Sequence, residues 1–127
     1  MTATANSAAF QPAGWHTVTP RLIVRDAEGL VDFVKDVFGA TGEYRSGAPT
    51  ELKIGDSMIM ISDAGVRDPM PACLYVYVES ADEIWRRAVH AGAQSVEAPL
   101  DLPYGDRRGM VKDPWENVWQ IATRRTA

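Results

Sequence analysis

The chain has 127 residues, of which 46% are hydrophobic and 24% are charged, and its formal net charge is −4. This composition is typical of one globular domain with a hydrophobic core. The acidic balance argues against a nucleic-acid-binding protein, which needs a basic face for phosphate contacts, and it is compatible with a cationic small ligand.

The chain contains one cysteine, Cys73, so no internal disulfide can form and a reducing compartment is expected. Its apolar runs are shorter than the ~18 residues of a membrane-spanning helix. The N-terminal segment lacks the basic region and apolar core of a signal peptide. We therefore expect a cytoplasmic protein that binds neither membranes nor nucleic acid, with residues 1–15 as a flexible tail and residues 16–127 as a single domain.

A strand, a helix and further strands are predicted in the first half of the chain. The apolar run Leu22–Val24 predicts a strand, and Asp26 is a suitable N-cap for the helix that follows. Apolar residues recur at helical spacing up to Gly39, where the helix should end, although Gly29 weakens it without an evident reason. Turn residues then separate three predicted strands: Glu43–Arg45, Glu51–Ile54 and Ser57–Ser62.

The same order of elements recurs in the second half. An apolar strand through Val76 precedes a helix, for which Ser80 and Glu83 form a capping box and Gly92 marks the end. Asp113-Pro114 predicts a tight turn between the last two strands. The chain thus predicts an α+β fold of two βαβββ modules, at about residues 16–64 and 70–124. The strands predicted after the second helix are Ser95–Glu97, Arg107–Lys112 and Val118–Thr123.

This repeat, with the segments TPRLIVRDAEGLVDFVKDVFGA and YGDRRGMVKDPWENVWQIATR, resembles the vicinal oxygen chelate superfamily, and within it the small glyoxalase and bleomycin-resistance-type proteins. The resemblance extends from Thr17 to Thr123. It implies a curled mixed sheet that forms a cup, often completed by a second subunit, so we expect a homodimer. It does not fix the function, because the superfamily includes lyases, dioxygenases, epimerases, thiol transferases and antibiotic-binding proteins.

Alternation along the strands predicts which side chains face the cup. Successive residues of a strand point to opposite faces, and the face that packs against a helix must be the apolar one. Leu22 and Val24 should therefore face the helix in the first strand, as Trp119 and Ile121 should in the last. The side chains left for the cup are mostly polar, aromatic or sulfur-containing, and those predicted to form the site are Thr19, Arg21, Met58, Met60, Cys73, Tyr75, Tyr77 and Gln120.

For a metal site, the resemblance implies one His or Glu ligand on each of four strands, as in the metal-bearing relatives. The matching positions in this chain are Thr19, Met60, Cys73 and Gln120. Hydroxyl, thioether, thiol and amide groups are poor substitutes for imidazole and carboxylate ligands. We therefore expect neither a bound metal ion nor another cofactor.

The last hairpin adds two candidates to the predicted site. Arg107 and Arg108 are neighbours on one strand and point to opposite faces, so at most one reaches the cup, and Arg107 is included. Trp115, on the turn, has no evident core partner and is predicted to cover the cup or a subunit interface. Relatives usually have glycine where this chain has Glu116, and Asn117 is expected to adopt the left-handed conformation in its place.

These features favour a metal-free protein that binds a small organic molecule. Methionine adapts its shape and tyrosine offers a flat face with a polar tip, which suits a flat or cationic ligand sequestered as in the bleomycin-resistance-type proteins. An alternative is an enzyme, either a glyoxalase-class lyase or a dioxygenase-like protein, which uses a metal site at other positions or an Arg/Tyr acid–base pair. A third alternative is a dimeric structural or interaction module whose cup is filled by side chains.

Overall fold

The first half of the domain forms a small sheet with one helix. A computed structural model describes residues 10–125, so most of the predicted tail over residues 1–15 lies outside the described residues. β3 pairs with β1 in parallel and with β2 in antiparallel orientation, which gives the strand order β1-β3-β2. The elements are β1 (Arg21–Val24), α1 (Ala27–Phe38), β2 (Thr50–Ile54) and β3 (Ser57–Asp63).

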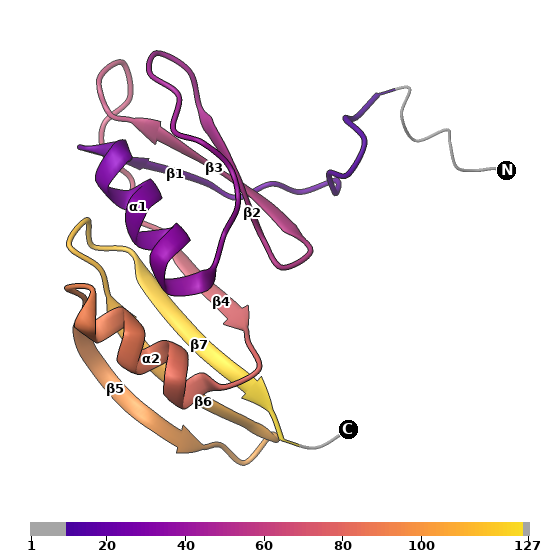
Figure 1. Ribbon diagram of the computed structural model, residues 1–127, viewed down its shortest axis with the longest axis vertical. Helices are drawn as coiled ribbons and strands as arrows, with labels where there is room; N and C mark the ends of the chain where they lie inside the picture. The colour runs from indigo at the N-terminus through magenta and orange to yellow at the C-terminus, as the bar shows by residue number, and fades with distance from the viewer. Residues whose placement is uncertain (1–9, 126–127) are drawn as a thin grey trace, which may run out of the picture.

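The second half repeats this plan with one more strand. β4 and β7 are parallel, and β6 is antiparallel to both β5 and β7, so the strand order is β4-β7-β6-β5. The α+β architecture predicted from the sequence, with one helix and one mixed sheet in each module, is confirmed (Figure 1). The elements are β4 (Cys73–Tyr77), α2 (Ala81–His90), β5 (Gln94–Asp101), β6 (Asp106–Lys112) and β7 (Val118–Arg124).

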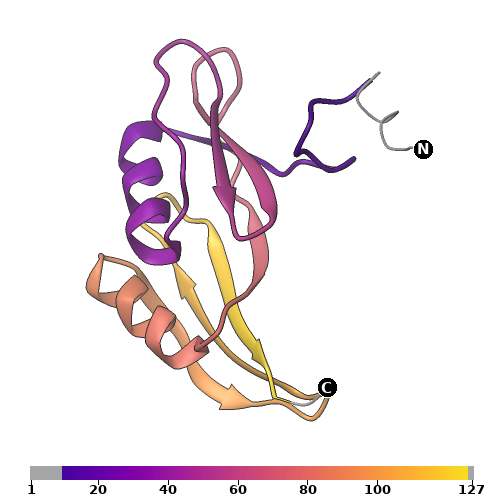
Figure 2. The same cartoon turned by 45° about the vertical axis from the view of Figure 1, so that its right-hand side comes forward.

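The two modules follow one another along the long axis of the molecule, and both helices cover the same side of the sheets (Figure 1, Figure 2). One hydrophobic core extends beneath both helices, and it includes the fully buried Ile61 and Trp119. The helices also contact each other, since Nη1 of Arg87 in α2 donates to the carbonyl oxygen of Val37 in α1 over 3.3 Å. In the described part of the chain, the opposite side of both sheets carries no helix, and we call it the open face.

The helix ends are capped as the sequence predicts. The Asp26 side chain accepts a hydrogen bond of 3.2 Å from the N–H of Gly29, and Gly39 ends α1 in the left-handed conformation with φ of 68°. At the start of α2 the hydroxyl of Ser80 accepts from the N–H of Glu83 over 3.2 Å. Among residues 10–125, neither helix has the length and apolar character needed to cross a membrane.

The glycine inside α1 has a packing reason. A Cβ at Gly29 would meet the carboxylate of Asp26 and would lie 2.9 Å from the ring of Trp115. That ring comes from the β6–β7 turn and packs edge-on against Phe33 of α1, with ring centroids 6.1 Å apart. The structure thus corrects the expectation that Trp115 lacks a core partner: its ring packs on the helix side of the molecule and does not cover the cup, and its predicted place at a subunit interface stays a prediction.

The segment after α1 differs from the prediction. Glu43–Arg45 forms no strand in the described part of the chain, where Thr41 and Lys53 make a single bridge. Side chains take the place of a ladder, because the N–H of Arg45 donates to the hydroxyl of Thr50 over 2.9 Å and the Tyr44 hydroxyl donates to Asp63 over 3.0 Å. A side-chain acceptor close in sequence competes with strand pairing in this way.

β5 is longer than the predicted strand Ser95–Glu97, because it continues through Pro99 to Asp101. The strand lies at the edge of the four-stranded sheet, where the missing N–H of a proline need not cost a ladder hydrogen bond. Its pairing with β6 shifts register near Glu97. The strand therefore continues through Pro99 with an irregular register.

The carboxylate of Asp113 organises the β6–β7 turn. It accepts hydrogen bonds from the backbone N–H of Asn117 over 2.9 Å and from the indole N–H of Trp119 over 2.8 Å. Glu116 itself adopts the left-handed conformation, with φ of 73°, so the prediction that Asn117 would do so is wrong. Asn117 instead serves a buried contact, since its Oδ1 accepts from the N–H of Ala72 over 2.9 Å.

Candidate ligand-binding face

The strands present the faces that alternation predicts. Leu22 and Val24 of β1 are buried with α1, and Trp119 and Ile121 of β7 are fully buried in the same core. Ile23, on the other face of β1, is also buried, in a segment where β1 pairs with Met70. Tyr75 and Tyr77 of β4, which alternate with the apolar Leu74 and Val76, therefore lie on the open face.

Two tyrosines of β4 share one carboxylate on the open face. The Tyr75 hydroxyl donates to Oδ2 of Asp106 over 2.6 Å, and the Tyr77 hydroxyl donates to the same oxygen over 2.8 Å. Asp106 lies on β6, so both side chains must cross β7 to reach it. Where they cross, β7 offers the small Ala122, which is the pairing partner of Tyr77 on one side and of Arg108 on the other.

The two rings form an exposed aromatic surface, which we call the tyrosine pair. The ring centroids are 5.4 Å apart and the planes are tilted by 58°. Tyr75 remains 37% exposed and Tyr77 61% exposed, although both hydroxyls are hydrogen-bonded. The hydroxyls are thus fixed in place while the ring surfaces stay accessible to a ligand.

The electrostatics of this cluster keep Asp106 charged and the phenols neutral. Asp106 is 1% exposed, and Nη1 of Arg124 lies 3.1 Å from its Oδ1. The hydrogen bond from Tyr75, with those from Tyr77 and Arg124, lowers the pKa of the carboxyl despite its burial. Burial and the bond to Asp106 raise the pKa of Tyr75, and the bond to Asp106 raises the pKa of Tyr77. Both phenols therefore act as fixed donors to Asp106.

Arg108, and not Arg107, reaches the open face. Nη2 of Arg108 lies 2.8 Å from Oε1 of Glu97, and its Nη1 donates to the Tyr104 hydroxyl over a long 3.4 Å. The predicted site residue Arg107 points to the helix side, where it forms a close ion pair with Asp82 of α2 over 2.6 Å. The predicted place of Arg107 beside the cup is therefore corrected: the ion pair with Asp82 holds it on the helix side, and alternation along β6 then directs Arg108 to the open face.

The remaining predicted residues lie apart from the tyrosine pair or at its border. Arg21 donates to the hydroxyl of Ser62 over 3.1 Å within the three-stranded sheet, which also carries the half-buried Met58 and Met60. Gln120, the pairing partner of Tyr75, donates to the sulfur of Met110 over 3.5 Å. Cys73 is exposed at the start of β4, and Thr19 precedes β1.

The donor set at the metal positions of the resembling family does not fit a divalent cation. Thr19, Met60, Cys73 and Gln120 supply a hydroxyl, a thioether, a thiol and an amide, and Met60 and Cys73 belong to different sheets. Within residues 10–125, no three His, Cys, Asp or Glu side chains gather as a metal centre. These residues offer none of the imidazole or carboxylate ligands that such ions prefer.

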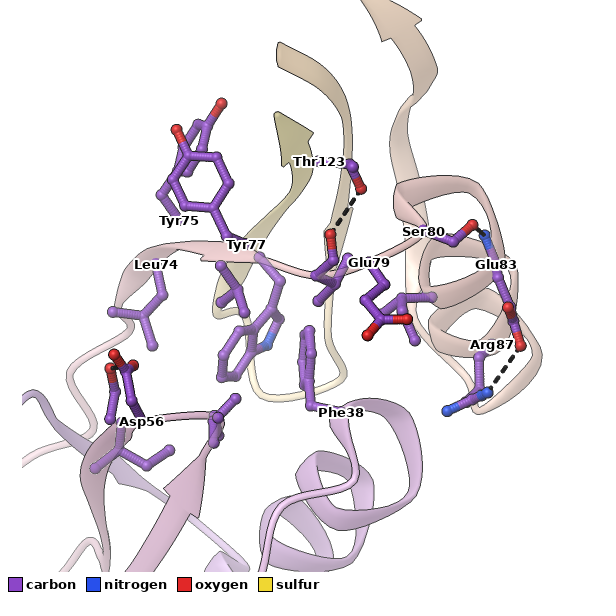
Figure 3. A pocket seen from close by; sticks show the side chains of 18 of the residues that line it. Phe38, Asp56, Leu74, Tyr75, Tyr77, Glu79, Ser80, Glu83, Arg87 and Thr123 are labelled. Carbon is purple, nitrogen blue, oxygen red and sulfur yellow. Dashed lines mark hydrogen bonds and ion pairs between the residues drawn. The ribbon is translucent and has the colours of Figure 1, made fainter. Parts of the chain in front are cut away.

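A cleft of about 1110 Å³ lies along the outer edge of β4, next to the tyrosine pair. In Figure 3 the rings of Tyr75 and Tyr77 lie on one side of β4, and Leu74 and Phe38 lie on the other. Of the residues predicted for the site, Tyr75 and Tyr77 also border this cleft. Its apolar wall is formed by Leu74, Val76 and Trp119 on the helix-facing side of the sheet, and by Phe38 at the end of α1.

The structure adds four residues that the sequence prediction missed: Tyr104, Asp106, Arg108 and Arg124. The predicted strand began at Arg107, one residue later than β6, so Asp106 was left in a loop. Extending the alternation by one residue would have placed Asp106 on the same face as Arg108. Tyr104 lies in the β5–β6 turn, where no periodic pattern indicates direction.

The fold agrees with comparisons to known proteins. Residues 15–121 match the family model described as the Glyoxalase/Bleomycin resistance protein/Dioxygenase superfamily. The chain belongs to this superfamily. An uncharacterized protein of Mycobacterium bovis is 30% identical over 122 residues, which cover 82% of this chain and 80% of that protein.

Solved structures of the superfamily share the fold. A glyoxalase/bleomycin resistance protein/dioxygenase family enzyme from Burkholderia phytofirmans aligns with a TM-score of 0.71 at 23% identity, covering 82% of this chain and 94% of that one. The fosfomycin resistance protein FosX from Mesorhizobium loti aligns with a TM-score of 0.65 at 21% identity, covering 85% and 91%. At these identities the likeness describes the backbone, and the function has to be argued from the side chains.

Proposed function

We propose that this superfamily member binds a small organic molecule, flat or cationic, on its open face and needs no metal ion to do so. The observation that carries the proposal is the tyrosine pair, in which two exposed rings are fixed through one buried carboxylate. A ring whose hydroxyl is already held loses little conformational freedom when a ligand stacks on it. Such a surface favours flat molecules over long flexible ones.

The same hydrogen bonds support a cationic ligand. A phenol that donates to a carboxylate becomes richer in electrons, which strengthens the attraction of a cation to the ring face. The formal net charge of −4 also favours the approach of a cation. Within the cluster itself, Asp106 is paired with Arg124 and Glu97 with Arg108, so the rings and not a free carboxylate would provide the attraction.

An enzyme of the glyoxalase or dioxygenase type is the alternative. It would need a metal site or a side chain that exchanges a proton near neutral pH. Tyr75 and Tyr77 are poor bases there because their pKa values are raised and their hydroxyls donate to Asp106. The donor set of Thr19, Met60, Cys73 and Gln120 is equally poor for a metal. Binding is therefore better supported than catalysis, and the exposure of both rings argues against a filled cup.

The biological setting that we propose is the sequestration of an antibiotic-like compound. Support comes from the family description, which includes bleomycin resistance, and from the similarity of the fold to a protein named for fosfomycin resistance. A protein that only sequesters a compound needs surface complementarity and no reactive group, which agrees with the side chains of the open face.

A melting-shift screen of flat organic compounds, anions and cations included, followed by calorimetry on variants, tests the proposed function. Truncating Tyr75 or Tyr77 to alanine should weaken binding by roughly thirtyfold, because a stacked aromatic side chain commonly contributes that much. Arg86→Ala is the control, since Arg86 is exposed on α2 and faces away from the open face. Equal affinity in all three variants would exclude the tyrosine pair as the site, and loss of binding on chelation would show that a metal is required.

A further inference from the structure

Arg108 has hydrogen-bonding capacity that the protein does not use. Its Nε is buried, yet within residues 10–125 it has no hydrogen-bond acceptor. Glu97 contacts the neighbouring Nη2 through Oε1, so this ion pair uses a single nitrogen of a guanidinium that can donate through several. A buried donor without an acceptor is costly, and a native protein usually has a reason for retaining one.

The side chain lies directly beside the tyrosine pair. Arg108 and Tyr77 are both pairing partners of Ala122, from opposite sides of β7. The Tyr104 hydroxyl connects the two groups, at 3.4 Å from Nη1 of Arg108 and 3.2 Å from the hydroxyl of Tyr75. Both contacts are long for hydrogen bonds of these types, and Tyr104 is 53% exposed, so a ligand can displace this side chain at low cost.

We propose that the ligand of the open face carries an oxygen acceptor, a carboxylate or a carbonyl group, that binds the Nε–H of Arg108 at the edge of the guanidinium whose Nη2 contacts Glu97. This inference rests on the proposed function and specifies the ligand class: a planar ring system bearing an acceptor at its edge. The ring stacks on the tyrosine pair, and the acceptor completes the hydrogen bonding of the guanidinium. Arginine suits this role because its planar fork holds a carboxylate in a defined direction.

Two probes with the same ring system separate the two parts of the site. 2-Naphthoate carries a carboxylate, and 2-naphthylmethylammonium carries a cation without an acceptor. Arg108→Lys retains the positive charge and a donor for Glu97 but removes Nε. It should weaken 2-naphthoate binding about tenfold or more, as expected for one charged hydrogen bond, and change the binding of the ammonium probe by less than about threefold.

Arg107→Lys is the matched control. It is the same substitution at the neighbouring residue, whose side chain lies on the helix side against Asp82. It should leave both affinities unchanged. Equal weakening of the two probes by Arg108→Lys would assign Arg108 a structural role only, and unchanged 2-naphthoate affinity would remove it from the site. Either result overturns the inference.

A measurement on the wild-type protein keeps the inference testable if Arg108→Lys does not fold. In a nitrogen-15 spectrum of arginine side chains, the Nε–H signal of Arg108 should shift when 2-naphthoate is added and stay in place when the ammonium probe is added. An unchanged signal at saturating 2-naphthoate overturns the inference. The proposed function itself fails if neither probe binds, or if Tyr75→Ala alters the affinity of neither probe. If both probes bind and Tyr75→Ala weakens them, but Arg108→Lys does not weaken 2-naphthoate selectively, only the inference about Arg108 fails.

Discussion

The hydroxyl of Tyr75 donates to Oδ2 of Asp106 over 2.6 Å, and this bond joins β4 to β6 across the intervening β7. The Tyr77 hydroxyl binds the same oxygen over 2.8 Å. Both rings therefore depend on one carboxylate for their position, and this dependence has consequences for stability and for binding.

Replacing Asp106 should change how stability depends on pH. The folded-state pKa of Asp106 lies below its ordinary value of 3.8, first because Tyr75 donates to it. Its contribution to stability is therefore fully present above about pH 4 and is lost as the pH falls through the lowered pKa. We expect Asp106→Asn to be less stable than wild type by a constant amount from about pH 5 to about pH 8, and the difference to shrink below about pH 4.

Urea unfolding at a series of pH values measures this difference. Asp56→Asn is the control, because Asp56 is exposed on the β2–β3 turn and accepts a hydrogen bond from the adjacent Ser57 hydroxyl. An acid limb that is identical in Asp106→Asn and in wild type would mean that the carboxylate does not stabilise the folded state.

A glycine-to-alanine change in α1 should destabilise the protein, against the usual trend. In a helix interior this change normally stabilises by about 1 kcal/mol. At Gly29 the added Cβ would lie 2.9 Å from the Trp115 ring, so we expect a net loss of roughly 1–2 kcal/mol. In a Trp115→Ala background the loss should shrink or reverse, and a double-mutant cycle by thermal or urea unfolding measures the coupling.

Glycine at position 116 should stabilise the β6–β7 turn. Glu116 adopts φ of 73°, a conformation that costs a residue with a Cβ about 1–2 kcal/mol. Because glycine also raises the entropy of the unfolded chain, we expect Glu116→Gly to gain up to about 1 kcal/mol in free energy of unfolding. Asn117→Gly should instead lower the stability, since Asn117 is buried and bonded to Asp113 and Ala72. A loss of stability in Glu116→Gly would show that the left-handed conformation of Glu116 does not destabilise the turn.

We propose that the protein is a homodimer that uses the outer edge of β4. No strand pairs with this edge among residues 10–125, and the cleft beside it has an apolar wall that includes Phe38 and Leu74. Unpaired edges and apolar walls of this kind are usually covered by a partner. Light scattering at micromolar concentration should give twice the mass of one chain, and the mass of a single chain would contradict the proposal.

Sequence periodicity was sufficient to predict the fold and the direction of the two tyrosines in the candidate site. Tyr75 and Tyr77 alternate with the apolar Leu74 and Val76, so their direction follows from the need to cover the helices. The helix boundaries followed from Asp26 and Gly39 in the same way, because caps are local signals. Local pattern therefore determined what lies on β4 and on α1.

The directions of Arg107, Arg108 and Trp115 depend on contacts between segments that are distant in the sequence. The strand parity of Arg107 and Arg108 placed them on opposite faces without showing which one faces the helices, and the ion pair with Asp82 of α2 decides it. Trp115 looked free because its partner Phe33 is far away in the sequence. Such contacts become predictable only when the packing of the modules is known.

The strand that carries the tyrosine pair is protected on one side only. The hydrogen bonds from Val118 to Ala72 and from Val78 to Ala122 show that Leu74 and Val76 direct their backbone groups to β7. The amides of Tyr75 and Tyr77 consequently point away from β7, to the outer edge of the sheet. The rigidity of both rings therefore comes from side chains reaching β6 and not from the backbone ladder. Substitutions on β6 can then change the positions of the two rings while the sheet keeps its pairing, so proteins that share this fold can present different surfaces at this place.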